Sequence, residues 1–318
     1  MPTGYIGTNC SVVWGNTGIT PCPYHPKEIE GFMLVPKGTV WTTTQVAALQ
    51  TTINSGIAAD LPTSRYYPIT RFESIEDKGT DAVETETSYG VAKFVRNGKY
   101  RWRGMYSNGA LDMHSELSKF NGLQDTFDVF IILKGNVFLG TASGDTSVKG
   151  YSLDTLYAPN IKVNTGGEDT MYAFEIGLED EAQLNKYFRA ITVPDTIPIV
   201  DTFRGLKPTR IEVVTHISAA SDLVSVRVWS GSTNLYDAYN GDIDVTTIWS
   251  LVNHTVGTTT AATVATAVPA SKSFNLTFGT AVTAASQECT IKLGTVTLLT
   301  AANLLNFANS EVATTSIA

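Results

Sequence analysis

The stretch Phe127-Asp128-Val129-Phe130-Ile131-Ile132-Leu133 is apolar at every position except Asp128. A strand with one face on solvent alternates apolar and polar side chains, whereas this run keeps apolar side chains on both faces. The run therefore predicts a central strand that is covered on both sides. The other strands and helices of the N-terminal half are expected to pack around this strand.

Strand and helix patterns surround this run. Val46, Leu49, Ile53 and Ile57 recur at helical spacing after Thr42, which predicts an amphipathic helix with a threonine N-cap. Further helices are predicted at 112–120 and 179–190, and further strands at 32–35, 66–72, 137–139, 150–157 and 170–176. The fold class predicted for this half is α+β, a β-sandwich or barrel with packed helices.

The dipeptide Asn97-Gly98 lies between two apolar runs, 90–95 and 100–106. Asn-Gly between alternating strands is a strong hairpin signal because both residues tolerate positive φ. We therefore expect a tight hairpin here. Four of its residues are aromatic: Phe94, Tyr100, Trp102 and Tyr106.

The segment that precedes this hairpin is acidic and rich in turn residues. Few large apolar residues lie between Glu76 and Thr87, so the segment can bury little surface and is predicted to be an extended loop. Its carboxylates are Glu73, Glu76, Asp77, Asp81, Glu84 and Glu86.

The chain changes character near residue 200. Residues 1–200 carry 38 charged side chains and residues 201–318 carry 14. Strand patterns alone follow the boundary, at 210–217, 223–229, 234–238, 245–251, 273–278, 289–293 and 296–299. About seven short strands in such a length are typical of an immunoglobulin-like sandwich. We therefore predict two domains, 1–198 and 199–318, the second an all-β Ig-like sandwich, although its Thr- and Ala-rich end from 255 also fits a low-complexity linker.

Composition and motifs argue against several kinds of function. The net charge of −8 disfavours tight nucleic-acid binding, which needs clustered lysine and arginine. The sequence has no phosphate loop, dinucleotide fingerprint or serine elbow. Cys10, Cys22 and His25 fall short of a four-ligand zinc set, and a Cys10–Cys22 pairing stays open. We expect no enzyme, no catalytic or metal residues, no cofactor, no signal peptide and no membrane span.

The region from Gly90 to Leu184 resembles a known family. It runs from Gly90-Val91-Ala92 through the Asn-Gly hairpin, the helix that ends in Lys119-Phe120-Asn121-Gly122 and the strand 127–133. It continues through Val148-Lys149-Gly150-Tyr151-Ser152-Leu153 to the segment 178–185. This order is similar to major tail tube proteins of long-tailed bacteriophages, especially phages of Bacteroidetes-type hosts. Some of those proteins carry a C-terminal Ig-like domain.

The resemblance implies a virion structural protein made in the host cytoplasm. Subunits of that family join their sheets into rings, usually hexameric, which stack into a tube that conducts DNA without specific binding. The partners would be copies of the chain and other tail proteins. Residues 73–87 would be the loop that reaches the next ring. Strands 91–95 and 100–106 would join the ring sheet, with Phe94, Tyr100, Trp102 and Tyr106 as its candidate contact residues. The acidic balance suits a DNA conduit, although Arg101 and Arg103 then need to face outward or pair with acids.

Two other classes of function remain open at this stage. A capsid decoration protein, a fibre subunit or a glycan-binding adhesin would also use a β-rich module with exposed threonines and Trp249. A carboxylate-dependent hydrolase would depend on the acidic segment, but a flexible loop lacks the walled pocket that separates the pKa values of a catalytic pair.

Overall fold

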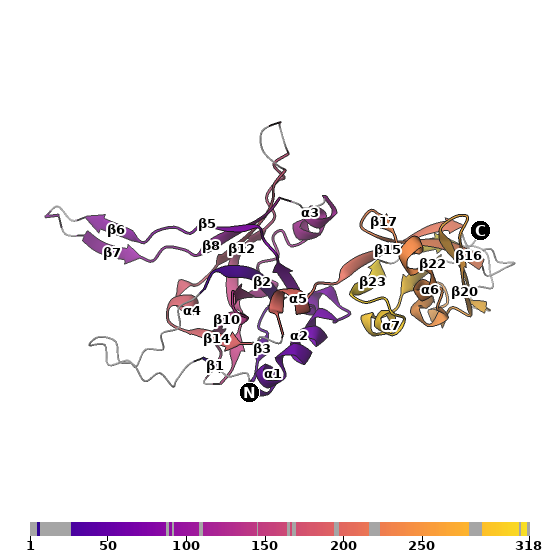
Figure 1. The fold of residues 1–318 in the computed structure, drawn as a ribbon, viewed down its shortest axis with the longest axis horizontal. Coiled ribbons are helices and arrows are strands. Elements are labelled where there is room, and N and C mark those ends of the chain that lie inside the picture. The colour runs from indigo at the N-terminus through magenta and orange to yellow at the C-terminus, as the bar shows by residue number, and fades with distance from the viewer. Residues whose placement is uncertain are drawn as a thin grey trace. The chain divides into compact units, whose positions relative to one another are not determined.

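The computed structural model describes residues 5–6, 27–86, 89–90, 92–107, 111–144, 146–163, 166, 170–193, 197–215, 223–279, 288–311 and 313–316. The chain is β-rich and divides into two compact units (Figure 1). The first unit comprises Met1–Ile57 and Leu61–Gly205, and the second comprises Ala58–Asp60 and Leu206–Ala318.

The first unit holds most of the strands. They are β1 (Tyr5–Ile6), β2 (Ile29–Pro36), β3 (Val40–Trp41), β4 (Tyr67–Thr70), β5 (Ser74–Asp77), β6 (Val83–Glu86), β7 (Ala92–Arg96), β8 (Arg101–Tyr106), β9 (Phe127–Leu133), β10 (Val137–Ala142), β11 (Val148–Lys149), β12 (Tyr151–Tyr157), β13 (Tyr172–Leu178) and β14 (Phe188–Thr192). Its helices are α1 (Thr43–Ala47), α2 (Leu49–Ile57), α3 (Leu111–Ser118), α4 (Glu181–Asn185) and α5 (Ile199–Thr202), with a 3-10 turn at Pro62–Ser64.

Strand β9 is the centre of this unit, as the sequence predicts. All seven of its residues are buried. On one side it pairs along its length with β2, and on the other side with β10 and then β12. Burial of apolar side chains on both faces of one strand requires covering layers on both, which explains the unbroken apolar run.

Two runs of strands meet at β9 and β12. One run is β1-β14-β10-β9-β2-β4, and the other is β12-β13-β8-β5. Side chains from both runs form one core, in which Phe32 of β2 contacts Trp102 of β8 at a ring distance of 6.2 Å. The α+β prediction is therefore right at the coarse level of a β-rich unit with packed helices.

The first predicted helix is confirmed with a break. Thr42 caps α1 by a capping box with Gln45, and a non-helical Ala48 separates α1 from α2. The four residues that the spacing selects, Val46, Leu49, Ile53 and Ile57, are all buried. The predicted helix near 112–120 is also present, as α3.

The hairpin predicted at Asn97-Gly98 is wrong. Strand β7 does not pair with β8, because β7 pairs with β6, while β8 pairs with β5 and β13. The chain runs onward from β7 to β8, and neither Asn97 nor Gly98 has positive φ. The reversal lies earlier, between β6 and β7, where Gly90 has φ of 74°.

The acidic segment is not a loop but one strand of a two-stranded ribbon, so that prediction is wrong as well. Thr80 donates to the carbonyl of Lys99 and Lys78 to that of Arg101, which joins the pairing of β5 with β8 to that of β6 with β7. We call residues 78–100 the arm; it projects from the sandwich (Figure 1). Cross-strand hydrogen bonds satisfy its backbone without a buried core.

The helix predicted at 179–190 ends after one short stretch. Asp180 caps α4, and Phe188 begins strand β14, which pairs with β10. The spacing of Leu184, Phe188 and Ile191 imitates a helix, but the long-range pairing with β10 decides the outcome.

The predicted domain boundary at 198 differs from the division in the structure, which falls after Gly205. Helix α5 belongs to the first unit because Ile199 and Phe203 are buried there and Phe203 contacts Phe138 at a ring distance of 6.3 Å. Residues 194–196, on which the proline-based boundary rested in part, lie outside the described residues.

The second unit contains two sheets. The strands are β15 (Lys207–Thr215), β16 (Leu223–Ser230), β17 (Thr233–Asn234), β18 (Trp249–Asn253), β19 (Thr258–Ala261), β20 (Val264–Val268), β21 (Ser273–Thr277), β22 (Glu288–Leu293), β23 (Phe307–Glu311) and β24 (Ala313–Ser316). One sheet has the order β20-β21-β16-β15-β23 with β17 beside β16, and the other has the order β19-β18-β22-β24. Both contribute to one core, where Trp249 contacts Phe274 at a ring distance of 6.4 Å.

Two predicted strands of the second unit are helices. The segment 234–238 enters α6 (Tyr236–Ile243), and 296–299 lies in α7 (Val296–Ala301), with a 3-10 turn at Thr246–Ile248 between them. Thr295 caps α7 and directs its first turn. The Thr- and Ala-rich end is not a linker where it is described, since it forms β19 to β24.

Candidate assembly surface

The six predicted carboxylates do not gather at one place. Glu73 accepts a hydrogen bond from the backbone N–H of Ser107 at the start of β5, and Asp77 accepts one from Gly79 at its end. Asp81, Glu84 and Glu86 are exposed along the arm. The acidic residues therefore follow one strand from the sandwich outward instead of lining one catalytic pocket.

Glu76 is the predicted carboxylate with a charged partner. Its side chain lies 2.7 Å from the ammonium of Lys78, and this hydrogen bond lowers the pKa of Glu76. Both side chains are about two-fifths exposed, so the pair contributes little stability. Because Glu76 and Lys78 carry opposite charges, the pair adds no net charge at the root of the arm.

Of the four predicted aromatic contact residues, only Phe94 is mostly exposed. Trp102 is buried in the core, and Tyr100 stacks on it at a ring distance of 5.8 Å. Tyr106 donates to the carbonyl of Thr70, and burial raises its pKa. Three of the four therefore serve the subunit's own core, because β8 is an internal strand between β5 and β13.

Arg101 and Arg103 find their partners within the chain. Arg103 pairs with Glu175, which is almost fully buried and also accepts a hydrogen bond from the hydroxyl of Tyr157 at 2.6 Å. Arg101 donates to the hydroxyl of Thr155. The two arginines that conflict with an acidic conduit are thus held by cross-strand partners of β12 and β13.

Strands β4 and β5 each leave one edge unpaired within the described part of the first unit. β4 pairs only with β2, and β5 pairs only with β8. Residues 71–73 join them, and Arg71 turns the corner with φ of 65°, an uncommon backbone state for a non-glycine residue. A free strand edge presents unpaired backbone groups that another strand can bind.

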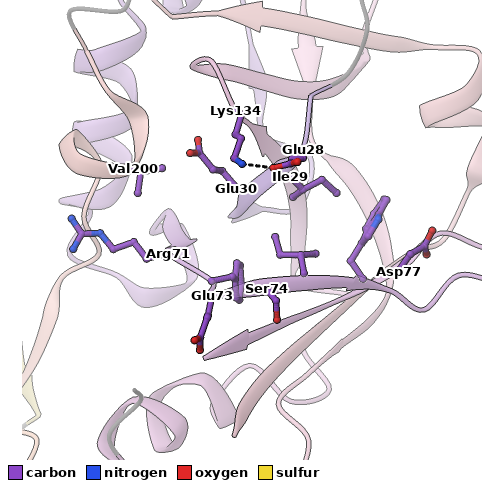
Figure 2. Close-up of a pocket in the computed structure, with 12 residues that line it drawn as sticks. Glu28, Ile29, Glu30, Arg71, Glu73, Ser74, Asp77, Lys134 and Val200 are labelled. Carbon is purple, nitrogen blue, oxygen red and sulfur yellow. Dashed lines mark hydrogen bonds and ion pairs between the residues drawn. The ribbon is translucent and has the colours of Figure 1, made fainter. Parts of the chain in front are cut away.

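A cavity of about 520 Å³ lies at this corner (Figure 2). Its acidic side chains come from the start of β2 and from β5: Glu28, Glu30, Glu73 and Asp77. Its two cations are paired, Lys134 with Glu28 and Arg71 with Asp201. No nucleophile lies hydrogen-bonded to a base among the described lining residues.

A second cavity of about 400 Å³ opens at one end of the sandwich, and we call it the end pocket. Its wall is apolar and includes buried Ile131, Leu133 and Leu139. Leu184 and Phe188 also line it, and its polar lining residues are Lys27 and Asn185, the latter accepting a 2.5 Å hydrogen bond from the hydroxyl of Tyr100.

The arm exposes apolar side chains, of which only Phe94 is predicted from the sequence. Tyr89 is 93% exposed, Phe94 57%, Val95 53% and Val83 38%. Every other residue between 81 and 97 whose side chain the structure describes is exposed too. The available signal was the presence of aromatic and β-branched residues in a segment too polar to form a core.

The expectations of no metal site and no membrane span can be compared only with the described residues. In those residues no three His, Cys, Asp or Glu side chains are grouped as for a metal ion, and Cys10, Cys22 and His25 lie outside them. Cys289 is buried with a free thiol. None of the described helices combines the length and apolarity that a membrane crossing requires.

No protein-family model matches the chain, and a search of curated proteins found no match to it.

Proposed function

We propose that this chain is a structural subunit that assembles with copies of itself, as the major tail tube subunit of a long-tailed bacteriophage. Copies would form rings, in the hexameric state usual for such proteins, and the rings would stack into a tube through which DNA passes. The observation that carries the proposal is the arm, a two-stranded ribbon that buries none of its described residues between 81 and 97 in its own subunit.

The arm has the chemistry of a contact surface. A ribbon of two strands is marginal by itself in water. Exposed large side chains such as Tyr89 and Phe94 leave their apolar area in solvent, and burial of each would contribute roughly 1.5–3 kcal/mol. Apolar side chains gathered on one projecting element mark an interaction site more often than singly scattered ones.

The free edges of β4 and β5 support the same proposal. A protein that circulates alone blunts such edges, whereas a ring closes them by pairing with its neighbours. The edges meet at the acidic corner cavity, where β5 offers its backbone beside Glu30 and Glu73. In the proposed ring these edges lie at the junction between subunits.

The second unit would decorate the outside of the tube as an Ig-like domain. That role is supported by the two sheets that share one core. One sheet contains β16 and β21, and the other contains β18 and β22. The helices α6 and α7 are additions that a plain Ig-like sandwich lacks. The location that follows from the proposal is the virion tail.

Negative-stain electron microscopy of the purified full chain tests the proposal. The expected result is rings or tubes, with larger species as the protein concentration rises. A matched variant deletes residues 82–97, which joins Asp81 to Gly98 as a two-residue Asp-Gly turn between the paired Thr80 and Lys99. This variant should fold and stay monomeric; a full chain that is monomeric at high concentration would refute the proposal.

A further inference from the structure

Phe94 is an exposed aromatic side chain of the arm that lies beside carboxylates of the facing strand. It lies directly opposite Glu84 in the pairing of β6 with β7. Because residues two apart on a strand share a face, Glu86 lies on the same side as Glu84. This face therefore presents one exposed ring beside two carboxylates, for which the structure shows no cationic partner among the described residues.

The end pocket has the complementary character. Its wall is made of aliphatic and aromatic side chains, and its volume of about 400 Å³ leaves room for an aromatic ring. Lys27 lines it, is exposed, and has no ion-pair partner among the described residues. The end pocket and this face of the arm are therefore complementary. The apolar wall can receive the aromatic ring, and the cation beside the opening can pair with a carboxylate beside the ring.

The arm cannot fill the end pocket of its own chain. Tyr100 lines the pocket, and Phe94 lies six residues before it along an extended chain, a span of about 20 Å. The arm leads away from the sandwich (Figure 1). A ring on the arm can therefore reach such a pocket only on another molecule.

We infer that Phe94 of one copy enters the end pocket of a second copy, with Glu84 of the arm beside Lys27 of the receiving subunit. This inference rests on the proposed function, since it names the contact through which the copies associate. The contact is head-to-tail, because the arm and the pocket are different surfaces of one chain, and such contacts generate closed rings or open filaments.

Matched variants test the contact by sedimentation velocity. Phe94→Asp removes the ring, and Leu184→Trp fills the pocket mouth; each alone should weaken self-association at least tenfold. Mixed together they should form heterodimers and nothing larger, because one intact arm then meets one intact pocket. Lys93→Ala, at the exposed residue that precedes Phe94 on the same strand, should assemble as the wild type does. Wild-type assembly by the Phe94→Asp variant would overturn the inference and leave the proposed function standing.

Charge reversal gives a second, independent readout. Lys27→Glu and Glu84→Lys should each weaken assembly several-fold, and the two together in one chain should restore it. Failure of the double variant to recover, when both single variants are impaired, would contradict the pairing of these two residues.

Crosslinking locates the contact itself. A photoreactive benzoylphenylalanine at position 94 should crosslink to residues 184–188 or 27–29 of a second copy. Crosslinks to other surfaces of the second copy would overturn the inference, as would a small amphiphile found in the end pocket of assembled wild-type protein. Wild-type protein that never assembles would instead refute the proposed function, and this contact with it.

Discussion

A Cβ atom built on Gly98 would lie 1.6 Å from the carbonyl oxygen of Thr80. The two strands of the arm approach so closely at this point that only a glycine fits. The glycine that the sequence suggests for a turn is thus required for a close approach between strands.

Gly98→Ala should therefore separate the strands at the root of the arm. The expected result is faster hydrogen exchange at the amides of Thr80 and Lys99, which donate across this crossing, together with loss of assembly. Gly241→Ala is the matched control, because a Cβ there meets nothing within 4 Å and alanine is the better helix former in α6. Unchanged exchange in Gly98→Ala would contradict the close crossing.

Arg103 and Glu175 form a pair in which the carboxylate is almost fully buried. Removal of the cation alone, as in Arg103→Met, leaves that charge without its partner and should lower the free energy of unfolding by about 3–5 kcal/mol. The double variant Arg103→Met with Glu175→Met should recover much of this loss. Chemical denaturation measures both, and equal losses in the single and double variants would show that the pairing does not matter.

Asp128 is a buried carboxyl within β9, and burial raises its pKa despite a hydrogen bond from the N–H of Gly38. A raised pKa in the folded state means that its contribution to stability is present below about pH 3.9, the unfolded value, and is lost as the pH rises through the folded value.

Asp128→Asn cannot ionise and keeps an oxygen for Gly38. It should therefore gain stability relative to the wild type as the pH rises from about 3 to 7, in urea unfolding at a series of pH values. Asp125→Asn, with a side chain that is 85% exposed, is the control and should show no such trend. A constant difference between Asp128→Asn and wild type across this range would contradict the prediction.

The sequence predicted the elements whose burial pattern is local. Two such patterns predict which faces are covered, and the structure buries those faces. They are the continuous apolar run of β9 and the helical spacing of Val46, Leu49, Ile53 and Ile57. Such patterns need no knowledge of the partner strand.

The elements that failed depend on distant partners. Asn97-Gly98 satisfies the local rule for a hairpin, but β8 pairs with β5 and β13 instead. Phe188–Thr192 reads as the end of a helix until its pairing with β10 is known. The candidate site was predicted in part for the same reason: the acidic residues of the arm were found, but three of the four aromatic residues proved to belong to the core.

Sedimentation velocity of the full chain beside the variant that lacks residues 82–97 measures whether the arm drives self-association. We expect oligomers of the full chain that grow with concentration, and a folded monomer for the variant at every concentration. Identical monomeric profiles for the two proteins, or oligomers of the same size in both, would contradict it.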